Sequence, residues 1–232
     1  MKIEKFSCLQ GAERARGTAV IIDVFRAFSV ACYCYHQGAS NVIPAGEVSQ
    51  AIEIAQKIDN AVLVGEREGK KLAGFDLGNS PTEVLQYDLT GKTVIQTTHA
   101  GTQGVVKAVQ ATEIITGALV NAKAIASYLS AGNHEQVSLV SMGLAGQTAS
   151  DEDELCAEYL HSLLLGEEFA EEQIIASLKK SPFSRRFFDP LMDWSPRSDF
   201  YHCLHLNCFD FILRGTRHES GYPCLERVHV GR

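Results

Sequence analysis

A short apolar run that ends abruptly in charge constrains the fold of this chain more than any other feature. Residues 19–22 are apolar and three of them are β-branched, which is typical of a strand buried on both faces of a parallel sheet. Asp23 and Arg26 follow where such a strand ends and a helix begins. Ligands bind at the carboxyl ends of strands in open α/β sheets, so this pair predicts a site. The alternative is a helix N-cap aspartate followed by a solvated arginine, and the sequence leaves both open.

The rest of the chain alternates short apolar runs with amphipathic segments. This alternation predicts β-α units and an α/β fold with a mostly parallel sheet, mixed strands being the alternative. Residues 181–199 show no hydrophobic pattern from which a helix or a strand can be assigned. Further strands are expected at 42–44, 61–64, 93–96, 113–116, 136–141 and 225–230. Helices are expected at 27–37, 48–57, 81–87, 103–109, 121–129, 152–165, 171–179 and 198–211.

Composition excludes several classes of protein. The 232 residues are 45% hydrophobic and 21% charged, as in ordinary globular domains. A net charge of −7 without a basic run argues against a nucleic-acid partner. No run of about 18 uncharged apolar residues occurs, so we expect no membrane span. The N-terminus lacks the apolar core of a secretory signal, and the seven cysteines lie mostly among apolar residues. Both features favour reduced thiols and a cytoplasmic location.

The chain shows no linker, internal repeat or low-complexity tract. We therefore expect a single α/β domain over residues 1–232, with a C-terminal subdomain from about residue 181 as the alternative. We expect a homodimer, because two-fold assemblies are the commonest oligomers.

Four predicted strand ends carry polar or glycine-rich residues. Because parallel strands end at one edge of a sheet, residues far apart in sequence are expected to meet in one cleft there. The four ends are Asp23 with Arg26, Glu66 with Arg67, the loop 97–102, and the segment 141–146 that leads to Glu152 and Asp153.

The residue types at these ends suggest phosphate chemistry with a metal. Carboxylates are hard oxygen ligands suited to Mg²⁺, which takes only one or two of them directly. Arginine forks suit phosphate or sulfonate, and backbone N–H groups at a helix start also favour anions. The carboxylates are Asp23, Glu66, Asp76, Glu152 and Asp153; the arginines are Arg26 and Arg67; the loop donors are Thr97, Thr98, Gly101 and Thr102.

Each motif also has a purely structural interpretation. Ser150 with Asp153 resembles a capping box, and Glu152 with Asp153 would complement the helix dipole. Residues 66–68 would form a solvated turn, and Ser80-Pro81 a plain helix start. The cysteines and histidines at 32–36 and 202–208 favour packing over zinc binding, although Cys203 could line a site. Nucleotide-binding glycine motifs and a serine-hydrolase elbow do not occur.

Five segments, taken together and in this order, resemble the 2-phosphosulfolactate phosphatase family of coenzyme M biosynthesis. The most specific is Gly74-Phe75-Asp76-Leu77-Gly78-Asn79-Ser80-Pro81. The others are Ile22-Asp23-Val24-x-Arg26-Ala27, Gly65-Glu66-Arg67, Thr97-Thr98-x-x-Gly101-Thr102 and Glu152-Asp153, with a weaker match around Asp199 and Cys203.

The resemblance implies a three-layer α/β/α fold and a Mg²⁺-dependent phosphatase that converts 2-phospho-3-sulfolactate to 3-sulfolactate and phosphate. The catalytic residues would be Asp23, Arg26, Arg67 and Asp76. The substrate, a small phosphorylated anion, would contact Arg26, Glu66, Arg67, Asn79, Thr97, Thr98, Gly101, Thr102 and Cys203. The metal ligands would come from Asp23, Glu66, Glu152 and Asp153.

The chain departs from the family pattern at two places. His99-Ala100 stands where Asn-Gly is expected, and Asn207 stands where an acid is expected. These departures keep two alternatives open: a phosphatase for another small phosphorylated carboxylate, and a non-catalytic binder of anionic metabolites. Direct attack by water and an aspartyl-phosphate at Asp23 also both stay open, although Phe25 replaces the second aspartate that the covalent route normally requires.

Overall fold

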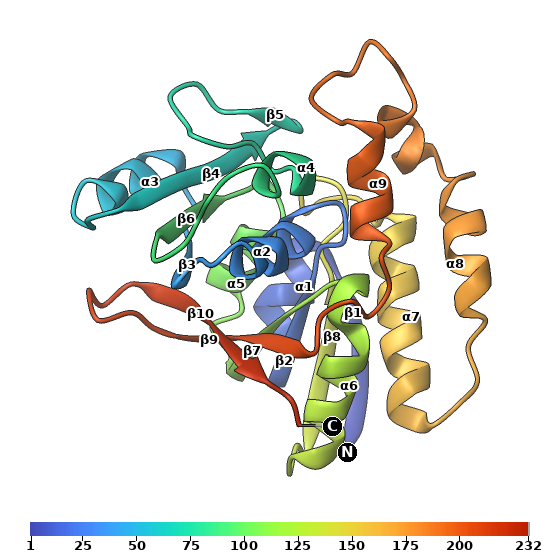
Figure 1. The fold of residues 1–232 in the computed structure, drawn as a ribbon. Helices are drawn as coiled ribbons and strands as arrows, with labels where there is room; N and C mark the ends of the chain where they lie inside the picture. Colours follow the sequence, from blue (N-terminus) through green and yellow to red (C-terminus); the bar gives the residue numbers. More distant parts are fainter. Residues whose placement is uncertain (232) are drawn as a thin grey trace.

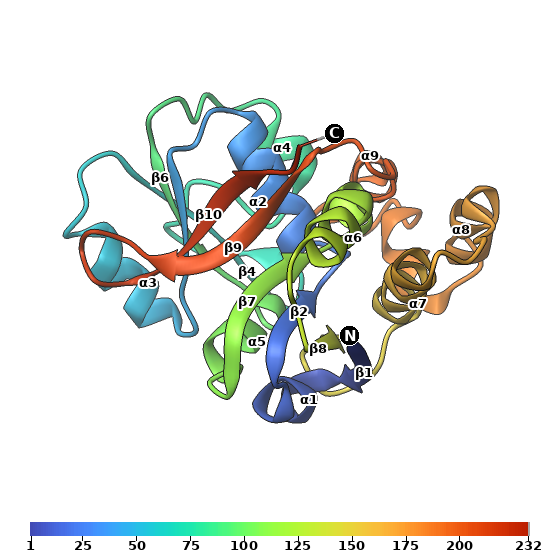
Figure 2. The same cartoon turned by 90° about the horizontal axis from the view of Figure 1, so that it is seen from below.

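The computed structural model describes residues 1–231 and contains a ten-stranded sheet with helices on both sides (Figures 1 and 2). The strand order is β1-β8-β2-β7-β9-β10-β3-β6-β4-β5. The strands are β1 (Lys2–Ser7), β2 (Gly17–Ile22), β3 (Asn41–Pro44), β4 (Ala61–Arg67), β5 (Lys70–Lys71), β6 (Thr93–Thr97), β7 (Ala111–Gly117), β8 (Gln136–Ser141), β9 (Phe211–Arg217) and β10 (Pro223–His229). The three-layer α/β prediction is therefore confirmed.

The sheet consists of two parallel groups joined by an antiparallel hairpin, with the short strand β5 antiparallel to β4 at one edge. Strands β1, β8, β2 and β7 run parallel, as do β3, β6 and β4. The hairpin β9–β10 lies between them, with β9 antiparallel to β7 and β10 antiparallel to β3. The sheet is thus mixed, which was the alternative to a mostly parallel one.

The helices are short except for α7, and most match the amphipathic segments of the sequence. They are α1 (Cys8–Arg14), α2 (Ala27–His36), α3 (Val48–Ala55), α4 (Pro81–Val84), α5 (Gly101–Lys107), α6 (Ala122–Ala131), α7 (Asp151–Leu165), α8 (Glu171–Leu178) and α9 (Arg197–Cys203). The 3₁₀ segments are η1 (Leu119–Asn121) and η2 (Pro182–Phe187).

Strand β2 shows why residues 19–22 are all apolar. Ala19 and Ile21 belong to the core that α1, α2 and α5 cover, whereas Val20 and Ile22 face α6 and α7 on the other side. Figure 2 shows these helices on opposite sides of β2 and β8. All four side chains are fully buried, and Val20, Ile21 and Ile22 each contribute about 1.5–3 kcal/mol of hydrophobic stabilisation. A strand between two helical layers has no solvated face, so the apolar and polar residues do not alternate.

The predicted helix over 198–211 is wrong in its second half. Helix α9 ends at Cys203, Asn207 adopts a left-handed φ of 56°, and Phe211 begins strand β9. The apolar residues between these points have helical spacing, but they pack against the core as an irregular connection. Strand β1 and helix α1 were not predicted; β1 lies at the edge of the sheet, where its apolar residues are interrupted by charged ones.

Two further predictions concern residues of helices α4 and α2. Ser80 caps α4 as predicted, accepting a hydrogen bond from Glu83 N, with Pro81 as the first helical residue. Cys32 and Cys34 lie in the hydrophobic core on α2, in agreement with a packing role.

Within residues 1–231, no helix has both the length and the apolar character needed to cross a membrane.

Candidate active site

A cavity of about 530 Å³ lies where several strands of the sheet end. Its wall combines the four predicted strand ends with one segment that the sequence left unassigned. The contributors are Asp23, Phe25 and Arg26 after β2; Glu66, Glu68 and Gly69 at the end of β4; Asn79 before α4; His99 and Ala100 after β6; Gly143, Leu144 and Ala145 after β8; Glu152 and Asp153 on α7; and Pro182, Phe183, Arg185, Arg186 and Met192. The structure thus gathers the charged strand ends in one cavity.

Asp23 joins two loops of the cavity through its carboxylate. Its Oδ1 accepts a hydrogen bond from Ala27 N at 3.0 Å, and its Oδ2 accepts one from Gly101 N at 2.9 Å. Burial raises the pKa of Asp23 to about 6, and the nearby charge of Glu66 adds to this rise. A Cβ on Gly101 would lie 2.7 Å from Asp23 Oδ2, so this close approach requires glycine.

Asp153 holds two other loops together in the same way. Its Oδ1 accepts from Val24 N and its Oδ2 from Gly143 N, each at 2.8 Å. The expected capping box is therefore wrong: Ser150 makes no side-chain cap, and the Asp153 carboxylate turns to the sheet edge. Burial raises the pKa of Asp153, and the charges of Asp23 and Glu152 raise it further.

Glu66 is the third carboxylate whose two oxygens both accept backbone N–H groups. Oε1 accepts from His99 N at 2.8 Å and Oε2 from Gly69 N at 2.7 Å. Glu66 is only 7% exposed, so the interpretation of residues 66–68 as a solvated turn is wrong for this side chain. Each of these three acids fixes a pair of backbone N–H groups at the cavity.

Glu152 and Asn79 differ from these acids because each retains a buried oxygen without a partner. Glu152 Oε2 and Asn79 Oδ1 accept no hydrogen bond from the described part of the chain, and both residues line the cavity. Burial raises the pKa of Glu152 to about 7, with a further contribution from the charge of Asp23. Buried polar atoms normally find a partner, so these two oxygens indicate a missing ligand, ion or water.

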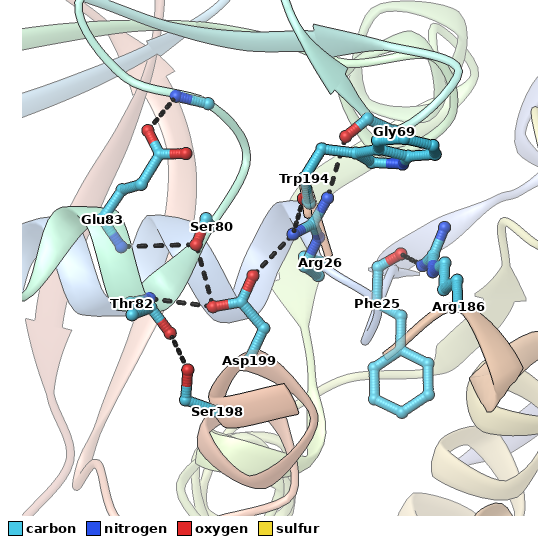
Figure 3. A network of polar contacts seen from close by, with 11 residues as sticks. Phe25, Arg26, Gly69, Ser80, Thr82, Glu83, Arg186, Trp194, Ser198 and Asp199 are labelled. Carbon is cyan, nitrogen blue, oxygen red and sulfur yellow. Dashed lines mark hydrogen bonds and ion pairs between the residues drawn. The ribbon is translucent and has the colours of Figure 1, made fainter. Parts of the chain in front are cut away.

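Arg26 is buried and ion-paired, so the alternative of a solvated arginine is wrong. Its Nη1 lies 2.5 Å from Asp199 Oδ2 and also donates to Trp194 O, while its Nη2 donates to Gly69 O (Figure 3). Asp199 Oδ1 in turn accepts from Ser80 Oγ and Thr82 N. The network fixes the Arg26 guanidinium at the cavity wall.

Sequence reasoning missed Arg186, which η2 brings to the cavity. Its Nη2 donates to Phe25 O at 2.9 Å, and its Nε is buried without a hydrogen-bond partner in the described chain (Figure 3). Burial lowers the pKa of Arg186, and the charge of Arg26 lowers it further. A Ser-Pro helix start followed by two adjacent arginines, in a chain with net negative charge, was the available signal.

The other predicted site residues, all within the described part of the chain, are not part of the cavity wall. Arg67 lies behind Glu66 and donates to Glu66 O, Thr97 Oγ1 and Gly46 O. Asp76 is exposed and accepts from Leu63 N. Gly101 and Thr102 begin α5, Thr98 precedes it and bonds Thr102, and Cys203 is fully buried in the core. Within residues 1–231, none of these residues lines the cavity.

The carboxylates of the cavity can supply one or two oxygen ligands to Mg²⁺, but they do not form a cluster that encloses the ion. Within residues 1–231, no three Asp, Glu, His or Cys side chains lie close enough together to enclose a metal ion. Mg²⁺ usually needs only one or two direct carboxylates and retains several waters. The unpartnered Glu152 Oε2 supplies one free carboxylate oxygen, and Asp23, Glu66 and Asp153 retain lone pairs beyond their N–H bonds.

Comparison with known proteins supports the resemblance. The family model described as 2-phosphosulpholactate phosphatase matches residues 7–214. A protein of Carboxydothermus hydrogenoformans, named probable 2-phosphosulfolactate phosphatase, is 35% identical over 95% of both chains. Relatives with the same name occur in Bacillus subtilis, at 29% identity over 91% of this chain and 92% of the relative, and in Caldanaerobacter subterraneus subsp. tengcongensis.

The extent of these matches differs between relatives. The Caldanaerobacter protein is 38% identical, but the match covers 64% of this chain and only 62% of that protein. The Carboxydothermus match and the family model each extend over most of the chain. The chain therefore belongs to the 2-phosphosulfolactate phosphatase family, a family of phosphoric monoester hydrolases.

Proposed function

We propose that this protein is a Mg²⁺-dependent phosphatase that hydrolyses 2-phospho-3-sulfolactate to 3-sulfolactate and phosphate. The observation that carries this proposal is the gathering of five carboxylates and three arginines around one cavity, in a chain of this family. Acids suit a divalent cation and arginines suit phosphate and sulfonate, so one cavity has donors for both parts of the reaction. The coenzyme M pathway, the cytoplasmic location and the homodimer remain predictions from the sequence.

When bound, Mg²⁺ supplies positive charge to the phosphoryl oxygens and lowers the pKa of a water molecule. Glu152 and Asp23 are the residues that we propose to hold it. Glu152 has a free buried oxygen, and Asp23 is oriented by two backbone N–H groups. Glu66 and Asp153, which like Asp23 each accept two N–H groups, would act through water or by fixing the surrounding loops, because Mg²⁺ usually takes only one or two carboxylates directly.

Arg26 is the residue that we propose to bind the transferring phosphoryl group. The structure accounts for three of its five N–H groups, which donate to Asp199, Trp194 and Gly69. Within the described chain, Nε–H and one Nη2–H remain for a phosphate oxygen. Because Asp199 holds the guanidinium in place before substrate binds, little reorganisation is needed as charge develops.

Direct attack by water is the route that this geometry favours. Both oxygens of Asp23 accept backbone N–H groups, which stabilises the carboxylate and weakens it as a nucleophile. Phe25 also occupies the position where a covalent route would place a second aspartate. We therefore propose that Asp23 helps to hold the metal ion and does not itself attack the phosphorus atom.

The two departures from the family pattern have different consequences. His99 lines the cavity and donates its backbone N–H to Glu66, so it favours the second candidate function, hydrolysis of another small phosphorylated carboxylate. Asn207 is not part of the cavity wall within residues 1–231: it accepts from Lys123 N and donates to Tyr159 OH. The departure at Asn207 therefore affects the contacts with α6 and α7.

Phosphate release from 2-phospho-3-sulfolactate and a panel of small phosphomonoesters, in Mg²⁺ and in EDTA, tests the proposal. Mg²⁺-dependent turnover of the sulfonated ester supports it. Turnover of other esters alone supports the second candidate. Binding of the ester without metal-dependent release of phosphate would make the protein a non-catalytic binder of anionic metabolites.

A further inference from the structure

Arg186 differs from Arg26 because it has no ion-pair partner within residues 1–231; Arg185, the third arginine of the cavity wall, has none either but is exposed. Arg26 is paired with Asp199, whereas none of the ion pairs formed within residues 1–231 includes Arg186. Its Nε is buried and unpartnered, although Asp23, Glu66 and Glu152 are close enough to influence its charge. A half-buried guanidinium in a cavity wall, without an ion-pair partner in the described chain, points to an anionic ligand.

The surroundings of Arg186 are largely apolar. Its guanidinium carbon lies 4.9 Å from the centre of the Phe187 ring, and its Nη2 is held by Phe25 O. Phe183 and Met192 also line the cavity. The hydrogen bond to Phe25 fixes one side of the guanidinium, and no hydrogen bond within residues 1–231 uses Nη1.

We propose that Arg186 is a specificity-determining residue that binds the sulfonate of the substrate. This inference rests on the proposed function. In 2-phospho-3-sulfolactate the phosphate and the sulfonate are on neighbouring carbons, so a phosphoryl group held near Asp23 and Glu152 directs the sulfonate to another part of the wall. A sulfonate is a singly charged anion with several acceptor oxygens, which suits a guanidinium among apolar side chains.

Three substrates separate the sulfonate from the other anionic groups. They are 2-phospho-3-sulfolactate, 2-phospholactate, which lacks the sulfonate, and the phosphate ester of isethionate, which lacks the carboxylate. Arg186→Met is expected to lower kcat/KM about 10- to 100-fold for the two sulfonated esters, mainly through KM, and less than about 3-fold for 2-phospholactate. Arg186→Lys should recover part of the loss, because it keeps the charge but not the fork.

The control is Lys180→Met, which removes one positive charge from an exposed residue shortly before η2 that is not part of the cavity wall. It should change none of the three kcat/KM values. An equal loss on all three esters in Arg186→Met would overturn the proposal, because it would place Arg186 at the phosphoryl group or in the fold alone. A loss on 2-phospholactate without a loss on the isethionate ester would assign Arg186 to the carboxylate and also overturn it.

Calorimetric binding of 3-sulfolactate and of lactate makes the test independent of turnover. Arg186→Met should weaken binding of 3-sulfolactate at least 10-fold relative to the native protein and leave lactate unchanged. If the native protein hydrolyses none of the esters, the proposed function fails, while this comparison still decides the role of Arg186. If Arg186→Met does not fold, Arg186→Lys provides the same comparison, and unchanged binding of 3-sulfolactate in a folded variant contradicts the proposal.

Discussion

The carboxylate of Asp199 lies 2.5 Å from the guanidinium of Arg26, although the two residues are 173 positions apart. Both side chains are almost completely buried, at 2% and 0% exposure. Through Ser80 and Thr82, the same carboxylate also contacts the start of α4 (Figure 3). Asp199, on α9, thus holds the guanidinium of Arg26 in place at the cavity wall.

Asp199→Asn should destabilise the protein strongly, because it leaves Arg26 buried without its counter-ion. We expect a loss of about 3–5 kcal/mol in the free energy of unfolding, measured by urea denaturation. The control is Glu226→Gln, which breaks the exposed pair Arg214–Glu226 and should cost less than about 1 kcal/mol. Equal losses in the two variants would show that burial of the Arg26 pair has no special effect.

Asp23→Asn should abolish phosphatase activity and preserve the fold. An amide in place of the carboxylate directs one NH₂ group at Ala27 N or Gly101 N, and it removes the charge proposed for the metal. We expect kcat to fall at least about 100-fold, with an unchanged far-UV circular dichroism spectrum. Asp88→Asn, which changes an exposed aspartate that accepts from Thr90 N, should keep full activity. Near-normal turnover in Asp23→Asn would contradict the assigned role.

Gly101→Ala should disturb Asp23 without touching any charge. The added Cβ would lie 2.7 Å from both Ala27 Cβ and Asp23 Oδ2, so the backbone or the carboxylate must move. We expect a loss of about 1–3 kcal/mol in stability and a fall in kcat. Gly46→Ala is the matched control, since its nearest neighbour would lie at 3.5 Å. Wild-type kcat in Gly101→Ala would show that the contact between α5 and Asp23 is not needed.

The stability of the metal-free protein should fall as pH rises. Burial raises the pKa of Asp23 to about 6 and that of Glu152 to about 7. A carboxyl whose pKa is higher in the folded state binds its proton more tightly there, so its contribution is complete below its unfolded pKa and is lost as pH rises through the folded value. In EDTA we expect the Tm to decrease between about pH 4 and pH 7.5.

Added Mg²⁺ should reverse this decrease near pH 7.5, since an ion that binds only the folded state stabilises it. Glu152→Gln should flatten part of the pH dependence in EDTA, because it removes one of the buried acids whose pKa is raised. Differential scanning calorimetry over this pH range measures both effects. A Tm that is independent of pH in EDTA would show that the buried acids do not govern stability.

The sequence predicts candidate site residues only where charged or polar residues follow an apolar run. Asp23, Glu66, Glu152 and Asp153 directly follow apolar strands or begin a helix after one, and the topology of parallel strands then brings them to one edge. Arg67 and Asp76 have the same residue types in the same kind of position, yet they are not part of the cavity wall: Arg67 donates to Thr97 Oγ1 and Asp76 accepts from Leu63 N. Which way a side chain turns from a strand end depends on its neighbours in space.

Alone, the sequence determined the class of fold and the chemical character of the site, because hydrophobic periodicity and charged strand ends are local properties. Only the tertiary structure decided that Arg26 is paired with Asp199, that Asp153 bonds the sheet edge instead of capping α7, and that Arg186 enters the cavity. Each of these depends on contacts between segments far apart in the chain. Burial and these contacts decide which charges are paired, like that of Arg26, and which, like that of Arg186, form no ion pair within residues 1–231.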